Sequence, residues 1–220
     1  MAQIESFVDA AQSANLVTFD GTRPVATLLP VIWERPERSG NGSRPDEEAD
    51  PASYGRLLGH IAVANPQWKT AAPDAEALAI VYGPQAYVSP AWYEAKARHG
   101  RVVPTWNYET VHLSGTVAFH QDPEWLRAFV TRLTLLHEGG REHPWAVTDA
   151  PPDYIDGQLR AIVGVELTIT SIEAKQKLSQ NRSELDREGV VTGLRAEHEP
   201  GPDAIADLMA AQLETADPQG

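Results

Sequence analysis

Short apolar runs separated by Gly, Pro, Asn and Asp recur along the chain, and most of them suit β-strands. Asp20-Gly21 is a typical hairpin turn, and Gly83-Pro84 predicts a second turn between two runs. Gly115 lies inside a long run, which indicates a bulge or a close packing contact. The predicted strands cover residues 16–20, 23–33, 56–64, 77–83, 86–89, 106–120 and 162–174.

Apolar residues at helical spacing predict a smaller set of helices between and after these strands. Asp122-Pro123 is a capped start for a helix over 124–138. The apolar stripe of this helix consists of Trp125, Phe129, Leu133 and Leu136. Further helices are predicted at 4–14, 65–72, 90–100 and 203–213.

This order of elements predicts a fold that is mainly β with peripheral helices (α+β). About six or seven short antiparallel strands with hairpin turns favour a barrel or sandwich over a doubly wound sheet. Neither GxGxxG nor GxxxxGK[ST] occurs, so the fingerprints of Rossmann and P-loop proteins are missing. We expect one domain over residues 1–175, with a mobile hairpin loop at 34–55, and a polar motif with a helical tail at 176–220.

Composition and charge narrow the possible partners. The chain has 31 acidic and 18 basic residues, a net charge of −13, which disfavours direct nucleic-acid binding. It has no cysteine, and its seven histidines show no ligand spacing, so we expect no metal site. No apolar run is long enough for a membrane span and no signal-peptide pattern opens the chain, so we expect a cytoplasmic protein without membrane contact.

The stretch "HIAVANPQWKT" at 60–70 is a candidate anion site. Asn65 suits the N-cap and Pro66 the first position of a short helix, whose free amides and Lys69 would attract an anion. The alternative is that Lys69 is a solvated surface lysine and Trp68 a core side chain. The local pattern alone favours this alternative, because most helix N-termini hold no ligand.

Four aromatic residues on two neighbouring segments could line a slot for a flat ring. Thr105 and Asn107 beside them would supply a hydroxyl and an amide to orient a heterocycle. Packing in the core and at its rim is the alternative explanation. The four aromatic residues are Trp92, Tyr93, Trp106 and Tyr108.

The stretch "KLSQNRSELD" at 177–186 gathers polar groups directly after a strand. Lys177, Gln180 and Arg182 suit a phosphate or the edge of a ring. Alternatively the stretch is the solvated start of a helix, with Ser183 as its N-cap.

Four motifs together resemble the PaiB family, described as FMN-binding negative transcriptional regulators. They are "GHIAVANPQWKT", "IVYGPQAYVSPAWYE", "VPTWNYETVHLSGTV" and "KLSQNRSELDREGVVTGL", and the resemblance runs from about residue 14 to 194. It implies an FMN-binding split β-barrel, similar to pyridoxine-phosphate oxidase, that forms a homodimer with FMN at the subunit interface.

The resemblance also implies which residues bind FMN. Lys69 is similar to the family's phosphate-binding basic residue after a barrel strand. Thr110 and His112 stand where a relative has a flavin-contacting Gln and an Arg, and Leu28 stands where the family often has His. The cofactor-binding candidates are Thr27, His60, Ala62, Asn65, Lys69, Trp106, Asn107, Thr110, Lys177, Gln180 and Arg182.

The implied function is that of a flavin-dependent regulatory or sensory protein, a negative transcriptional regulator. The alternative is an FMN-dependent oxidoreductase, similar to a flavin reductase or oxidase, in which FMN supplies the hydride chemistry. A third possibility is a binding or storage dimer without catalysis. No residue is assigned a catalytic role.

Overall fold

The computed structural model describes residues 1–36, 54–72 and 76–216. Most of the predicted 34–55 loop lies outside these residues, so the expectation that it is mobile is not tested. The described chain divides into two compact units, residues 1–81 with 111–173 and residues 82–110 with 174–220. The second unit therefore includes 82–110, which the sequence had grouped with the barrel.

The elements of the structure follow the predicted order. The strands are β1 (Ser13–Phe19), β2 (Pro24–Glu34), β3 (Arg56–Ala62), β4 (Glu76–Val88), β5 (Thr105–His120) and β6 (Ile162–Lys177). The α-helices are α1 (Ala2–Ala11), α2 (Gln67–Thr70), α3 (Glu94–His99), α4 (Pro123–Glu138), α5 (Pro152–Leu159), α6 (Glu184–Ala196) and α7 (Pro200–Ala216), and the 3-10 turns are η1 (Pro90–Trp92) and η2 (Val147–Asp149). None of the helices in the described ranges is long and apolar enough to cross a membrane.

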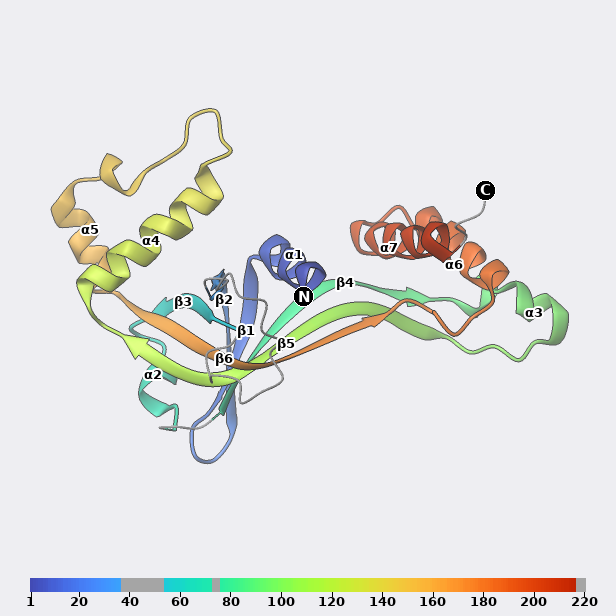
Figure 1. The fold of residues 1–220 in the computed structure, drawn as a ribbon, viewed down its shortest axis with the longest axis horizontal. Coiled ribbons are helices and arrows are strands. Elements are labelled where there is room, and N and C mark those ends of the chain that lie inside the picture. Colours follow the sequence, from blue (N-terminus) through green and yellow to red (C-terminus); the bar gives the residue numbers. More distant parts are fainter. Residues whose placement is uncertain (37–53, 73–75, 217–220) are drawn as a thin grey trace, which may run out of the picture. The chain divides into compact units, whose positions relative to one another are not determined.

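The strands form a closed barrel in the order β1-β2-β3-β6-β5-β4 (Figure 1). The β1–β2, β2–β3, β3–β6 and β1–β4 pairs are antiparallel, which confirms the barrel. Alternate side chains such as Leu16, Val31 and Leu167 fill the interior, as the period of two requires. At Gly115 an added Cβ would lie 1.8 Å from the Thr168 carbonyl oxygen, so the predicted close contact is present.

Helix α4 covers the outer side of β3 and β6. Gly164 leaves room for the Trp125 ring, because a Cβ there would lie 2.1 Å from that ring. The Trp125 ring stacks between His120 and Phe129, at centroid distances of 4.5 Å and 5.5 Å. The predicted apolar stripe therefore faces the barrel through Trp125, Phe129 and Leu133, but Leu136 at its far end is 46% exposed.

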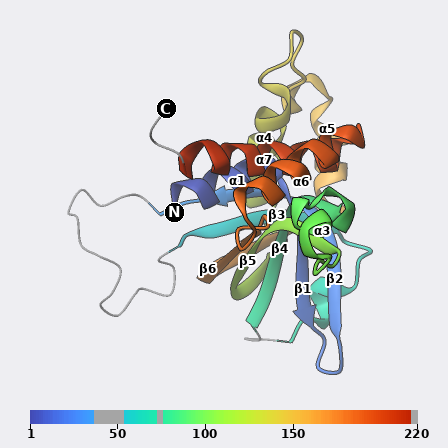
Figure 2. The same cartoon turned by 90° about the vertical axis from the view of Figure 1, so that its right-hand side faces the viewer.

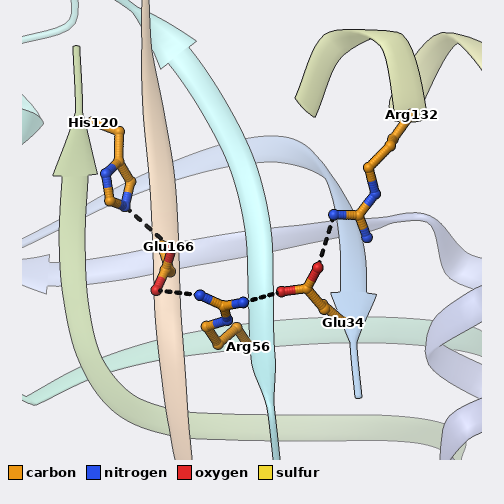
Figure 3. Close-up of polar contacts among 5 residues, drawn as sticks. All are labelled: Glu34, Arg56, His120, Arg132 and Glu166. Carbon is orange, nitrogen blue, oxygen red and sulfur yellow. Dashed lines mark hydrogen bonds and ion pairs between the residues drawn. The ribbon is translucent and has the colours of Figure 1, made fainter. Parts of the chain in front are cut away.

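A chain of charged side chains continues this outer layer (Figure 3). Arg132 of α4 donates to Glu34 at 2.8 Å, Glu34 also bonds Arg56, and Arg56 reaches Glu166 at 3.3 Å. His120 Nε2 lies 3.2 Å from the other Glu166 oxygen, within ion-pair distance but without a hydrogen bond. The network joins β2, β3, β5 and β6 with α4.

The second unit has its own core around α6 and α7, which lie side by side (Figure 2). Leu178, Leu194 and Met209 are fully buried in it. Ser183 accepts a hydrogen bond from the Asp186 amide at 3.2 Å, so it caps α6 as predicted. The buried Asp186 carboxylate accepts from the Ala95 amide at 2.8 Å and so fastens α3 to α6.

Several boundaries differ from the prediction, and two of the differences have a clear physical reason. The β4 strand runs through Gly83-Pro84, where a turn was predicted. The buried residues of β4 have odd numbers up to Val81 and even numbers from Ala86 onward. An extra residue in the strand, as in a β-bulge, would cause this shift. Helix α1 ends at Ala11, not Ala14, because Gln12 adopts a left-handed conformation with φ 53.

We predict that Glu34→Gln lowers the free energy of unfolding by about 1 kcal/mol at neutral pH. The substitution removes the carboxylate charge that pairs with both Arg132 and Arg56. Burial tends to raise the Glu34 pKa, but the hydrogen bond from Arg132 and the charge of Arg56 outweigh it and hold this pKa below 4.5. A carboxylate with a lowered pKa stabilises the folded state above its unfolded pKa and loses this effect as the pH falls.

Urea unfolding of wild type and Glu34→Gln should therefore give curves that converge as the pH falls below 4.5. Glu94→Gln is the control, because Glu94 forms an exposed ion pair with Arg98 on its own helix and lies outside the network. A constant difference between wild type and Glu34→Gln across this pH range would contradict the role of the network.

Candidate functional site

The candidate anion site is the turn that follows β3. The Asn65 amide donates to the Ala62 carbonyl at 2.9 Å, and Asn65 Oδ1 accepts from the Gln67 amide at 2.9 Å. Helix α2 begins at Gln67, with Pro66 at the cap position, one residue later than predicted. The Asn65 side chain still caps the first helical amide. Because α2 has four residues, its dipole is small and a bound anion would depend mainly on side chains.

Two side chains attach this turn to the β1–β2 hairpin. Asn65 Nδ2 donates to Thr27 Oγ1 at 2.9 Å, so two of the predicted residues are in direct contact. Gln67 is fully buried, and its Nε2 lies within hydrogen-bond distance of Leu16 O, Thr18 Oγ1 and Val25 O. Gln67 is not among the predicted site residues, because a glutamine between Pro and Trp carries no local signal of burial.

Lys69 is exposed on this turn. Its Nζ lies 4.8 Å from the centre of the Trp68 ring, and Trp68 Nε1 donates to the Val63 carbonyl at 3.0 Å. Trp68 also packs against the barrel core, so the core role considered for it is real. Within the described ranges no carboxylate pairs with Lys69.

His60 faces α4, on the outer side of the barrel. Its ring meets Phe129 edge to face at 5.8 Å, and its Nδ1 is buried and has no hydrogen-bond partner within residues 1–36, 54–72 and 76–216. Burial lowers the His60 pKa, so the ring is neutral at neutral pH and does not add positive charge to the site. No hydrogen bond or ring contact in the described part of the chain joins His60 to Asn65 or Lys69.

The remaining candidates belong to the second unit. Trp106 is 46% exposed, donates from Nε1 to Gln85 Oε1 at 3.0 Å, and lies 6.5 Å from the half-exposed ring of Tyr87. These two aromatic faces are open to solvent. Asn107, in contrast, is completely buried and its amide bonds Ser179 Oγ at 3.1 Å, which gives it a structural role within this unit.

The polar cluster after β6 is largely engaged with its own unit. Lys177 Nζ donates to Thr105 Oγ1 at 2.6 Å, and the Arg182 guanidinium lies 4.7 Å from the centre of the Tyr93 ring. Gln180 Oε1 accepts from the Leu178 amide at 2.9 Å. Thr110 is half-buried on β5. The described residues contain no group of acidic and histidine side chains suited to a metal ion.

The sequence matches a known family over most of its length. The family described as "Putative FMN-binding domain" covers residues 1–171. "Protease synthase and sporulation protein PAI 2" of Bacillus subtilis is 31% identical over 211 residues, which cover 96% of this chain and 92% of that protein. An uncharacterized protein of Aspergillus fumigatus is 35% identical over 186 residues, covering 68% of this chain and 71% of that protein.

Solved structures share the fold at low sequence identity. The FAD and heme binding protein of Mycobacterium smegmatis has a TM-score of 0.54 at 17% identity, covering 87% of this chain and 77% of that one. The flavocytochrome Anf3 of Azotobacter vinelandii has a TM-score of 0.53 at 14% identity, covering 86% and 72%. These likenesses concern the fold alone. The family match and the Bacillus subtilis relative show that the chain belongs to the PaiB family and that its barrel is an FMN-binding domain.

Proposed function

We propose that this protein is a flavin-dependent regulatory or sensory protein of the PaiB type, and that the turn at Asn65–Lys69 holds the phosphate of FMN. The observation that carries the proposal is Lys69, an exposed cation without a carboxylate partner in the described ranges, on a turn attached to the barrel at several points. FMN supplies redox chemistry when bound, and the side chains of this turn supply binding and orientation.

The residues of the turn fit a phosphate group. The Lys69 ammonium can form charge-assisted hydrogen bonds with phosphate oxygens, and the same turn carries the Asn65 amide, which is bonded to the Thr27 hydroxyl. The net charge of −13 repels anions at long range, so binding needs a cation whose charge is not already neutralised. The FMN contacts of Trp106, Lys177 and the other candidates of the second unit remain predictions from the family resemblance.

A regulatory role is supported by the Bacillus subtilis relative, whose name refers to protease synthesis and sporulation. The net charge of −13 argues against direct contact with DNA, because neutralising phosphates needs clustered bases. We therefore infer that regulation passes through a small-molecule or protein partner. The cytoplasmic location also remains a prediction.

We further propose that the protein is a homodimer. Tyr87 and Trp106, adjacent in space, are each about half exposed, as are Tyr82 and Leu28 at 53% and 66%. Exposed aromatic residues are typical of interfaces between subunits. This supports the expected arrangement in which the flavin lies near a subunit boundary.

We predict that the purified protein binds FMN and that NAD(P)H alone does not bleach the bound flavin. The absorbance spectrum of the protein with FMN, recorded before and after anaerobic addition of NAD(P)H, measures both. Rapid bleaching would favour the oxidoreductase alternative. The absence of any bound flavin would contradict both functions.

We predict that Lys69→Ala weakens FMN binding by about ten- to a hundredfold, the usual value of a charge-assisted hydrogen bond. Riboflavin, which lacks the phosphate, should bind the variant and the wild type equally well. Flavin fluorescence titration measures both affinities. Lys96→Ala is the matched control, because Lys96 is also an exposed lysine in a short helix. Unchanged FMN affinity in Lys69→Ala would remove Lys69 from the phosphate site.

We predict a sedimentation mass of twice 24.0 kDa for the wild type at micromolar concentration. The double variant Tyr87→Ser, Trp106→Ser should shift it toward the monomer, since it removes the exposed aromatic faces. A monomeric wild type would contradict the dimer, and a double variant that stays fully dimeric would place the interface elsewhere.

A further inference from the structure

Gln67 is a buried polar side chain with an unusual position, inside a four-residue helix on an otherwise exposed turn. Its exposed fraction is 0%, whereas its neighbours Pro66 and Lys69 are exposed. We propose that Gln67 is a positioning residue that orients Lys69 toward the FMN phosphate. The inference rests on the proposed phosphate-binding role of Lys69.

The Gln67 amide joins the turn to two strands. Nε2 lies 3.2 Å from Leu16 O and 3.1 Å from Thr18 Oγ1, both on β1, and 3.2 Å from Val25 O on β2. Thr18 and Val25 are paired across the β1–β2 hairpin. The two N–H groups of one amide are therefore shared among three acceptors of the barrel wall, which holds α2 at one place and in one orientation.

Helix geometry relates the position of the Gln67 side chain to the direction of the Lys69 side chain. Successive residues of an α-helix are rotated by about 100°, so side chains two residues apart point in nearly opposite directions. Burying Gln67 therefore turns Lys69 outward. The Lys69 amide donates to Pro66 O at 2.9 Å and the Ala71 amide to Gln67 O at 2.9 Å, so the backbone between the two side chains is held in place.

The side-chain oxygen of Gln67 indicates why a glutamine, and not an apolar residue, suits this position. Gln67 Oε1 is buried and has no hydrogen-bond partner among the residues that the structure describes. A buried carbonyl oxygen without a partner is destabilising, and an apolar side chain of similar length would avoid that cost. The contribution of glutamine therefore lies in its donors, which fix the turn.

Gln67→Met tests the proposal, because methionine has a similar length and volume and has no donor. We expect the preference for FMN over riboflavin to fall at least about fivefold, toward that of Lys69→Ala, because a misplaced cation loses its phosphate contact. Riboflavin affinity should stay within about twofold of wild type. In the double variant Gln67→Met, Lys69→Ala, the preference should fall no further than in Lys69→Ala.

Hydrogen exchange of the protein without flavin gives a second readout. Amides in a peptide covering residues 62–72 should exchange faster in Gln67→Met, while peptides of β5 and β6 keep their wild-type protection. If Gln67→Met does not fold, Thr18→Val removes one of the three acceptors and should give a smaller change in the same direction. Leu126→Ala, which opens a cavity under α4, is the control for general destabilisation and should leave the FMN preference unchanged.

The outcomes separate this inference from the proposed function. If wild type does not prefer FMN to riboflavin, the phosphate role of Lys69 fails and the inference fails with it. A second outcome is that Lys69→Ala loses the preference for FMN over riboflavin, while Gln67→Met and Thr18→Val keep it. If amide hydrogen exchange at 62–72 is also unchanged in these two variants, only the inference is overturned. An equal loss of FMN and riboflavin affinity in Gln67→Met would also overturn it, because that pattern indicates a general structural role.

Discussion

The barrel depends on the close approach of β5 and β6 at Gly115. No other residue type fits there, because a Cβ would meet the Thr168 carbonyl at 1.8 Å. The absence of a side chain at Gly115 lets β5 and β6 approach closely, and neighbouring side chains such as Leu113 and Ile169 are fully buried in the barrel. A second glycine, Gly164, has the same effect on the outer face, where it admits Trp125 of α4.

The outer face of the barrel near β3 and the turn that follows β3 have different environments. The outer face of β3 and β6 is covered by α4 and by the network from Arg132 to His120, so His60 is enclosed there and remains neutral. The turn after β3 is attached instead to the β1–β2 hairpin, and it keeps Lys69 exposed. Strand β3 therefore lies in a covered part of the barrel wall and leads into an exposed turn that carries Lys69. This combination suits a binding site, which must be both preorganised and accessible.

A net charge of −13 disfavours the approach of an anionic cofactor, and a cation that no carboxylate pairs with locally offsets this repulsion. Most arginines of the barrel unit do have such partners, including Arg56 and Arg132. Lys69 rests on the Trp68 ring instead, which restricts the ammonium without neutralising it. Within the described ranges, this difference in pairing supports the proposed role of Lys69 at the FMN phosphate.

Local patterns predicted much of this structure. The strands, the Asp122 cap, the Ser183 cap and the close contact at Gly115 follow from residue types and spacing over a few positions. The family motifs indicated FMN and Lys69. The continuous β4 strand was missed, since a Gly-Pro pair predicts a turn equally well when no neighbouring strand is known.

The order of the elements, the mainly β class and the family motifs can be predicted from residue types alone, because they depend on patterns over a few positions. The burial of particular polar residues cannot be predicted in this way and is seen only in the folded chain. Gln67, Asn107 and His60 look like ordinary polar positions in the sequence, yet two are completely enclosed and the third largely so. The reason is that their burial depends on acceptors and rings, such as Leu16 O and Phe129, that lie tens of residues away along the chain.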